Sequence, residues 1–495
     1  METGMAPNVN DPRGARALES MRNILGRASD SYLARVHQGG LGVAKAGTST
    51  KWDLGLGLQA RSLRAPALLT YPIAAPFLKV CPREQMNPVS HLAEWKKITQ
   101  VDSNYVDVSV AEDGTGNEFD VTTQDLFGTI KQLALLQKVG WSAQLEGKDF
   151  MDAKATAALT LLQKFREGEE DVVLGGNGTT ALVKPGAPSG VSALGGSLAT
   201  GVYTLKATAL TARGKRLAQK ATYDPSVITG QTELSNASGA VTLAIGSEKI
   251  TWSWPGTPGA WGYNVFIDKD GGGYKFQGTV FMNKWVELTY NAAGGATPAS
   301  NGTVIATQFE GLFTQLLTSG DAGFLSMDGA ALTGDSAGGI TQLTQLFESA
   351  FRRWYVGPNE IWGSGSSIEC LTKKVAYNSS APAYRINIEG GETNIEGGIK
   401  IGSILNRFTG DHVKLFSHPR LPDGRLYGIR RDNPYDYSNM GRCFQVLTAV
   451  DYYQVEYAVT ASEGRVWPVG IYAHEIMQLF FGGGGFILQD FDPTA

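Results

Sequence analysis

The sequence predicts a mixed α+β fold that is interrupted by one all-β domain. Glycine accounts for 62 of the 495 residues, with no Gly-X-Y period, so the excess belongs in the turns of a β-rich fold. Helical periodicity occurs before residue 182 and after residue 303, whereas the interval between them reads as short strands separated by turns. The host chain on either side of that interval alternates helical and strand patterns. We therefore expect one α+β domain with an inserted β-sandwich.

The composition excludes several classes of protein. With 42% hydrophobic and 18% charged residues the chain is not disordered, and a net charge of −4 excludes a globally basic nucleic-acid-binding protein. The three cysteines, Cys81, Cys370 and Cys443, lie far apart without a C-x-x-C motif, which argues against a disulfide scaffold and a cysteine-based zinc site. Neither a signal-peptide core nor an apolar stretch of about 18 residues is found. We expect a protein of a cytoplasm-like compartment without a membrane anchor.

The N-terminal region reads as a basic arm. Residues 14–37 have apolar positions at helical spacing, and the stretch that follows, to about residue 65, is glycine-rich and irregular. Residues 1–64 contain nine basic and five acidic side chains, a net charge of +4. The arginines of the predicted helix and its flank are Arg13, Arg16, Arg22, Arg27 and Arg35.

Residues 92–122 read as a long two-stranded excursion. Alternating valines indicate a strand, and the turn-rich AEDGTGNEFD follows it. The segment contains no obvious apolar surface against which this strand could pack. We expect this segment to pack against something outside its own domain. The residues predicted to take part in self-assembly are Trp95, Lys96, Lys97, Ile98, Val106, Val108 and Val110. The two lysines are otherwise expected on a solvated face of the loop.

The host chain contains two clear amphipathic helices. The first covers residues 148–174 and is stopped by the glycine run that begins at Gly175. The second covers residues 340–355; a strand-like EIWGS and a further helical segment, SIECLTKKVAY, follow it. Strands dominate residues 384–470.

The interval 182–303 is predicted to be a self-contained antiparallel sandwich with its own core and without a helix. Its candidate strands include GVYTLKATAL, GAVTLAIG, KITWSW and GYNVFIDKD, and the linkers KPGAPSG and NAAGGATPASNG bracket it. It contains ten basic and six acidic side chains, so its net charge is +4. The part of the chain outside the arm and the insert therefore has a net charge of −12.

No catalytic, cofactor-binding or metal-binding residue is predicted, and the chain is not expected to be an enzyme. Gly334–Gly338 matches G-x-S-x-G but lacks the buried strand and oxyanion segment that this motif needs. His474-Glu475 begins like H-E-x-x-H, but Gln478 occupies the second histidine position. Ordinary loop or strand-end positions are expected for the remaining candidates, His412, His418, Glu389, Glu392 and Glu396.

The order of the host segments resembles the major capsid protein of tailed bacteriophages, which has the Hong Kong 97-type fold. The segment DLFGTIKQLALLQKVGWSAQLEG looks like the strand that leads to the family's spine helix, and the helix ending EEDVVLGGNG is similar to the ending common there. TQLFESAFRRWYVGPNEIWGSGSSIECL resembles the entry to the family's axial domain. The insert resembles a fibronectin type III or immunoglobulin-like domain in Gly201–Leu205, Ile250–Trp252 and Gly262–Phe266.

The resemblance implies a division of the chain into eight segments. These are an N-terminal arm (1–65), a connection (66–91), an extended β-hairpin loop (92–122), a peripheral domain with the spine helix (123–181), the inserted sandwich (182–303), a return to the peripheral domain (304–349), an axial domain (350–435) and return strands (436–495).

The resemblance also implies a function, namely self-assembly into the hexamers and pentamers of an icosahedral head that encloses double-stranded DNA. The implied partners are further copies, a portal, scaffold or decoration proteins and, non-specifically, packaged DNA, with no cofactor and no membrane. The implied location is the virion, after assembly in the host cytoplasm. The arm arginines either meet DNA phosphates in the lumen or dock on a neighbour's acidic surface. Crosslinking through Lys96 or Lys97, which is possible in this family, is not expected.

Two alternatives remain open from the sequence. One is an encapsulin-like shell that holds enzyme cargo. The other is a carbohydrate-active enzyme with a fibronectin-like accessory domain, in which Trp252, Trp254 and Trp261 would stack on sugars rather than fill the sandwich core.

Overall fold

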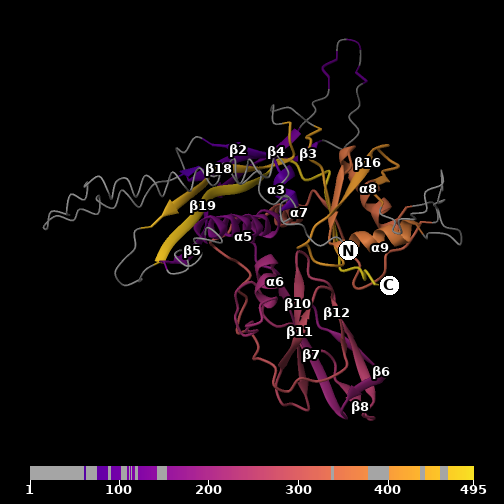
Figure 1. Cartoon of the computed structure of the whole chain (residues 1–495). Helices are drawn as coiled ribbons and strands as arrows, with labels where there is room; N and C mark the ends of the chain where they lie inside the picture. Colours follow the sequence, from indigo (N-terminus) through magenta and orange to yellow (C-terminus); the bar gives the residue numbers. More distant parts are fainter. Residues whose placement is uncertain are drawn as a thin grey trace, which may run out of the picture. The chain divides into compact units, whose positions relative to one another are not determined.

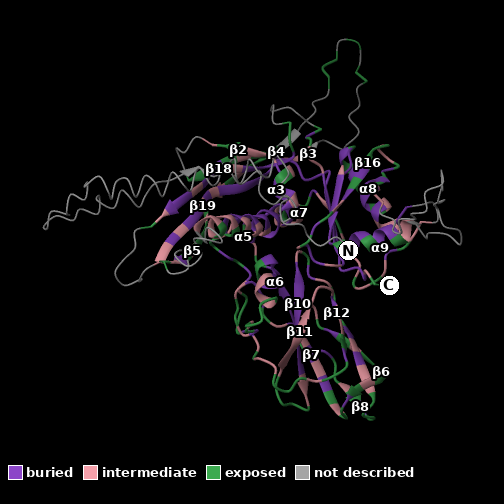
Figure 2. Cartoon of the chain, in the orientation of Figure 1, coloured by how far each residue is buried: buried purple, intermediate pink, exposed green. Residues whose placement is uncertain are grey.

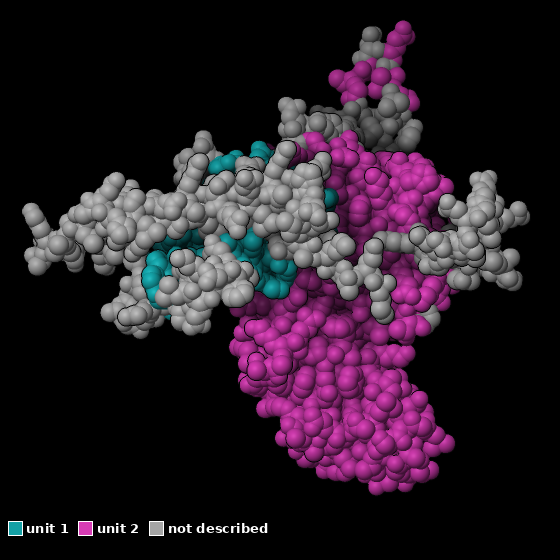
Figure 3. Space-filling view, viewed as in Figure 1, with its two compact units in different colours: residues 1–93, 129–170, 446–476 teal, residues 94–128, 171–445, 477–495 magenta. Residues whose placement is uncertain are grey.

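The computed structural model describes most of the chain from residue 75 onward. The described residues are 61–62, 75–86, 91–101, 109–110, 112, 114–116, 121–141, 153–335, 339–376, 401–434, 441–457 and 466–494. The predicted arm helix, most of the loop between residues 102 and 120, and the three glutamates of the NIEGG repeat lie outside them. Two compact units divide the chain, residues 1–93, 129–170 and 446–476 in the first and residues 94–128, 171–445 and 477–495 in the second (Figure 3).

The first unit is built on a sheet of long strands. Its strand order is β1-β18-β19-β5, and β2 pairs in parallel with β18. Of the two longest strands, β18 has its first two residues in the second unit and β19 has its last three there. The elements are β1 (Arg61–Ser62), α3 (Pro76–Val80), β2 (Arg83–Gln85), β5 (Lys131–Gly140), α5 (Ala153–Gly175), β18 (Phe444–Glu456) and β19 (Val466–Leu479).

Helix α5 packs along this sheet through a narrow apolar stripe. Leu161, Leu162 and Phe165 are buried against Tyr452 of β18 and Ile471 of β19. Phe165 meets Tyr452 edge to face, with the ring centroids 6.0 Å apart. The helix ends at Gly175, at the predicted glycine run. Figure 1 shows α5 lying lengthwise beside β18 and β19.

The second unit contains a six-stranded mixed sheet with the order β13-β20-β17-β14-β16-β15. Helices α8 and α9 cover it, and their apolar residues form one buried cluster with those of the sheet. The elements are α7 (Leu312–Ser319), β13 (Gly323–Ser326), α8 (Thr341–Trp354), β14 (Glu360–Gly363), α9 (Gly365–Ala376), β15 (Ser403–Leu405), β16 (His412–Ser417), β17 (Leu426–Ile429) and β20 (Phe486–Gln489).

Helix α8 shows how directly the sequence pattern sets this packing. Leu343, Leu346, Phe347, Ala350 and Trp354 recur at helical spacing and are all buried. The backbone then turns into the left-handed region at the residue after the helix. The mixed α+β class and the helix predicted over residues 340–355 are both confirmed.

A second part of this unit consists of two facing antiparallel sheets. One has the order β11-β10-β7-β8 and the other β12-β9-β6, and residues from both sheets share one buried cluster. We call this part the sandwich. Its strands are β6 (Ser189–Leu198), β7 (Gly201–Leu210), β8 (Val241–Leu243), β9 (Glu248–Ser253), β10 (Gly262–Lys269), β11 (Lys275–Val280) and β12 (Lys284–Glu287).

The prediction that this interval lacks a helix is wrong. Helix α6 (Ala212–Ala218) follows β7 directly, and the Thr211 hydroxyl caps it by accepting a hydrogen bond from the Gly214 N–H at 3.2 Å. The helix has only two turns and buries a lysine, Lys215, together with Ala212 and Gly214. A helix this short with a charged buried position leaves no apolar period in the sequence.

The two-stranded excursion is present as strands β3 (Leu92–Val101) and β4 (Val121–Thr129), which among the described strands pair only with each other. We call this pair the ribbon. The predicted strand of alternating valines is not among the described strands, because Val110 lies in irregular backbone and Val106 and Val108 lie outside the described residues.

Candidate assembly interface

The ribbon is fixed at its base by side chains of its own unit. The Trp95 indole N–H donates to the Leu479 carbonyl at 3.1 Å, and the Ile98 N–H donates to the Phe480 carbonyl at 2.9 Å. Lys97 forms an ion pair with Asp321, just after α7. Trp95 and Ile98 are therefore partly covered within their own chain, contrary to the expectation that only a neighbouring subunit would cover them.

The expectation of a solvated Lys97 is wrong. Its side chain and that of Asp321 are each only 4% exposed. Burial raises the pKa of Asp321, and the Lys97 ammonium opposes that rise. The two residues are separated by more than 200 positions, so no local pattern announces the pair. Lys97 thus anchors the ribbon and does not belong to its free surface.

Beside these anchored residues the ribbon also presents side chains to solvent. Lys96 is 74% exposed and lies 3.7 Å from Asp125 of β4, an exposed pair that adds little stability. Phe127, also on β4, is 62% exposed, and Val110 is exposed as well. A two-stranded ribbon is marginally stable by itself. The ribbon thus combines a base fixed within its own chain with exposed apolar side chains.

The arm arginines cannot be placed in this interface from the structure. Arg13, Arg16, Arg22, Arg27 and Arg35 all lie outside the described residues.

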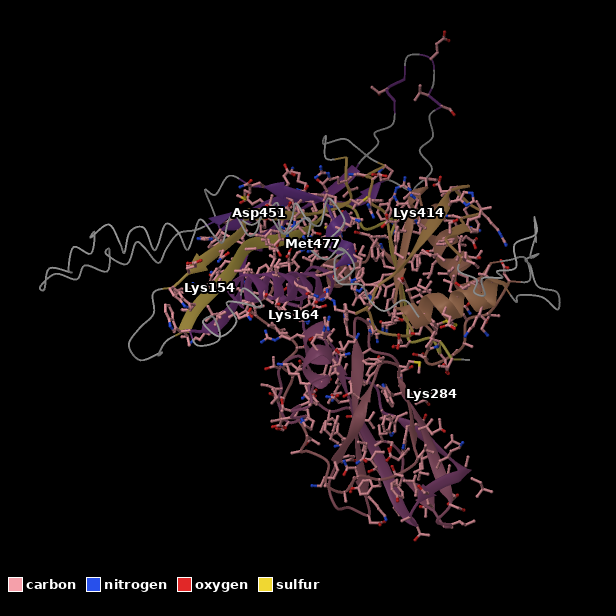
Figure 4. All side chains as sticks on the ribbon, in the orientation of Figure 1. Lys154, Lys164, Lys284, Lys414, Asp451 and Met477 are labelled. Atoms are coloured by element: carbon pink, nitrogen blue, oxygen red, sulfur yellow. The ribbon has the colours of Figure 1, made fainter. Side chains whose placement is uncertain are left out.

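The first unit holds a buried charge cluster that was not predicted from the sequence. Arg83 of β2 forms ion pairs with Glu169 of α5, with Glu475 of β19 at 2.6 Å and with Asp451 of β18 at 3.2 Å. The Tyr452 hydroxyl donates to the Glu169 carboxylate at 2.7 Å. One guanidinium thereby joins a helix and three strands of the sheet; Asp451 is labelled in Figure 4.

This cluster has more carboxylates than cations at its centre. Burial, and next the neighbouring Glu169 carboxylate, raise the pKa of Glu475 to about 8, while Arg83 opposes the rise. Burial by itself lowers the pKa of Arg83, but the surrounding carboxylates outweigh it and raise that pKa well above its usual value. Glu475 therefore takes up a proton at a higher pH than an exposed glutamate does.

A second buried cluster joins the sandwich to the six-stranded sheet. Arg425, next to β17, pairs with Asp490 at 2.9 Å, and the Tyr263 hydroxyl of β10 donates to the same carboxylate at 3.0 Å. The Gln489 amide donates to the Thr257 carbonyl at 3.1 Å. The partners lie more than 60 residues apart, so sequence spacing gives no signal for them. The insert is thus fixed to the host by polar contacts as well as by its linkers.

Helix α6 adds a buried lysine to the same junction. The Lys215 ammonium donates to the Arg420 carbonyl at 2.8 Å and lies 5.1 Å from the Phe281 ring centroid. Burial, followed by repulsion from Arg216 and Arg425, lowers the pKa of Lys215 to about 7.

The sequence motifs that suggested chemistry have structural roles. In the G-x-S-x-G segment the Asp335 carboxylate accepts the Gly339 N–H at 2.7 Å and pairs with Arg407 at 2.9 Å, next to the start of α8; residues 336–338 are not described. His474 Nε2 lies 3.0 Å from the Tyr453 hydroxyl. Within the described ranges no group of three potential metal ligands is found, and no helix is long and apolar enough to cross a membrane.

Comparisons with known proteins find similarity only at the level of structure. No family model and no curated protein sequence matches the chain. The capsid of cyanophage A-1(L) aligns with a TM-score of 0.39 at 9% identity, covering 84% of this chain and 93% of that one. The capsid of Myoviridae phage XM1 aligns with a TM-score of 0.35 at 8% identity, covering 84% and 91%. The holo-SrpI encapsulin complex of Synechococcus elongatus gives a TM-score of 0.39 at 8% identity, covering 85% and 89%.

The similar solved structures are mostly tailed-phage capsids and encapsulins. They belong to the same group of proteins that the order of segments resembles in the sequence. At TM-scores below 0.5 a function has to be inferred from the residues of this chain.

Proposed function

We propose that this chain is the major capsid protein of a tailed double-stranded DNA bacteriophage. In this proposal its copies form the hexamers and pentamers of an icosahedral head, and the chain has no catalytic role. The eight segments inferred from the sequence are its working parts, including an immunoglobulin-like insert. The arm arginines meet packaged DNA without reading its sequence. A portal and scaffold or decoration proteins are its other partners, and assembly takes place in the host cytoplasm.

The observation that supports the proposal most strongly is the construction of the ribbon. A buried ion pair at Lys97 and the Trp95 hydrogen bond hold its base. Phe127 and Lys96, beside these anchored residues, remain exposed. Fixing the base of a coreless ribbon is useful when the remainder binds a neighbour, and shell subunits need such reaching segments. Large obligate interfaces also require no catalytic groups.

The construction of the first unit supports the same function. Helix α5 is held to its sheet by an apolar stripe and by the Arg83 cluster. A subunit that has to meet several neighbours at fixed angles needs such a stiff frame.

The proposal is tested by replacing the ribbon tip. Residues 102–120 are exchanged for Asn-Gly, a dipeptide that closes two-residue hairpins, so that β3, β4 and the Lys97 anchor are kept. We expect a folded subunit with unchanged thermal unfolding that forms no closed particles by negative-stain microscopy and sedimentation. The wild-type chain, purified in the same way, is expected to form them.

Particles from the tip-replaced variant at the wild-type yield would contradict the role of the ribbon. A wild-type chain that stays monomeric, or that hydrolyses glycans, would contradict the capsid function itself. Particles filled with enzyme cargo instead of DNA would indicate an encapsulin-like shell.

A further inference from the structure

The sandwich has four edge strands, and β6 differs from the other three. Strand β8 has only three residues, and β12 has four, two of which are Lys284 and Glu287. Strand β11 begins with Lys275, and its Phe276 N–H already donates to the Gly295 carbonyl. Short, charged or covered edges of this kind prevent unwanted strand pairing.

Strand β6 has none of these protections over residues 189–194; its register with β9 shifts between Leu194 and Leu198, where the Ser197 N–H donates to the Leu288 carbonyl at 3.2 Å. It runs for ten residues, SGVSALGGSL, without a charged residue or a proline, and pairs only with β9 among the described strands. Side chains on both of its faces are exposed, with Val191 at 70% and Leu194 at 69%. Figure 2 shows exposed and intermediate residues along most of the strand. Its outer edge is therefore open to a further strand.

The outer face beside this edge carries an apolar row, flanked by Lys249 and Lys284. Val191 is in register with Thr251 of β9, which is in register with Val286 of β12, so the three form one row across the outer face of the sheet. The exposed aliphatic residues on this sheet and at the adjoining end of the sandwich are Val191, Leu194, Val202, Ile245, Val286 and Leu288. A group of exposed aliphatic side chains beside an open edge marks an interaction site.

We propose that the outer edge of β6 pairs antiparallel with β6 of a second copy of this chain. Two three-stranded sheets would thereby become one six-stranded sheet with the order β12-β9-β6-β6-β9-β12. A pairing centred on Ser192 would place Val191 of one copy beside Ala193 of the other. On the outer face, Val191 of each copy would then contact Ala193 of the other across the seam.

The chemistry of the strand favours a second copy over a foreign peptide. Strand addition takes its affinity from the main chain and its specificity from side-chain pockets. In β6 the side chains are mostly glycine, serine and alanine, which allow close approach but form no pocket for a foreign sequence. Since the strand has no charge, two identical copies meet without like-charge repulsion. The ten basic residues of the insert all lie outside it.

The pairing is tested by disulfide trapping in the full-length protein. Val191→Cys, Ser192→Cys and Ala193→Cys are prepared singly, which covers the neighbouring registers, and Thr242→Cys on edge strand β8 is the matched control. The natural cysteines Cys81, Cys370 and Cys443 are all buried and do not compete. After mild oxidation we expect at least one β6 variant to give about tenfold more covalent dimer than Thr242→Cys, because paired strands hold opposite thiols at millimolar effective concentration.

A second variant separates pairing from random collision. Adding Ala193→Lys to Ser192→Cys places the two lysines of a dimer diagonally across the seam, within reach of each other, and should strongly reduce the dimer without lowering the unfolding temperature, since Ala193 is exposed. Equal dimer yields from the β6 and β8 cysteines, or dimer that persists at the same yield with the lysine, would overturn the proposal. This inference does not depend on the capsid function. Trapped dimer without closed particles would contradict only the proposed capsid function, and closed particles without trapped dimer would contradict only the pairing of β6.

Discussion

Three largely buried cations each meet a carboxylate that lies far away in the sequence. Lys97 pairs with Asp321, Arg83 with Glu169 and Arg425 with Asp490. Removing two charges from water is costly, and their mutual attraction offsets that cost only while both partners are present. At each of these positions, loss of one partner therefore destabilises the protein more than loss of an exposed charge.

Lys97→Met is expected to lower the free energy of unfolding by about 3 to 5 kcal/mol, because Asp321 would be left buried and unpaired. Urea unfolding followed by tryptophan fluorescence measures the loss. Lys96→Met, at the exposed neighbouring position, is the control and should change stability by less than about 1 kcal/mol. The double variant Lys97→Met/Asp321→Leu should recover part of the loss. Equal effects of the two single lysine substitutions would show that the pair does not anchor the ribbon.

Glu475 is expected to make stability depend on pH. Its pKa of about 8 in the folded protein lies above the ordinary value of 4.5. Between pH 4.5 and 8 the folded state therefore binds more protons than the unfolded state, and the free energy of unfolding falls as the pH rises through this range. Glu475→Gln keeps the uncharged form and should flatten the dependence of the unfolding temperature on pH between 6 and 9. Glu84→Gln, an exposed glutamate on β2, should leave the wild-type slope unchanged. A slope in Glu475→Gln identical to that of the wild type would contradict the raised pKa of Glu475.

The secondary structure elements differ in how far the sequence predicts them. Helix α8 was predictable because five apolar residues fall on one face, and the end of α5 because of Gly175. Helix α6 escaped prediction because it buries Lys215 instead of an apolar stripe. The partners of Lys97 and Arg425 were not predictable either, because charge pairs formed by tertiary contacts leave no periodicity in the sequence.

Two glycines of helix α5, Gly168 and Gly175, have different surroundings. A Cβ added at Gly175 would lie 2.3 Å from the Trp261 ring, whereas one added at Gly168 would have nothing within 4 Å. Gly175→Ala should therefore destabilise the protein by about 1 to 3 kcal/mol through overpacking. Gly168→Ala should stabilise it by about 0.5 to 1 kcal/mol through helix propensity. Thermal unfolding of both variants measures the two effects. Effects of the same sign would show that Trp261 does not restrict the side chain at position 175.

At the scale of the whole chain, the sandwich and the six-stranded sheet keep separate cores. Every residue of the sandwich core falls between residues 198 and 290, and every residue of the other core between 325 and 491. The chain enters and leaves the sandwich at one place, because the Leu182 N–H donates to the Thr303 hydroxyl at 3.0 Å. An insertion with adjacent ends and a private core is removable without opening the host.

We therefore expect that exchanging residues 184–301 for a short Gly/Ser linker still gives closed particles. The host keeps the pair of Arg425 with Asp490 and the stacking of Phe313 on Tyr427, with ring centroids 3.8 Å apart. It loses the hydrogen bond from the Tyr263 hydroxyl to Asp490, so the unfolding temperature should fall. Tyr263→Phe in the full-length chain measures separately how much this hydrogen bond contributes to the unfolding temperature. Because a sandwich on the lumen side would compete with DNA for volume, we expect the missing density on the outer surface in electron micrographs. A variant that cannot assemble although it folds, or density missing from the inside, would contradict this placement of the insert.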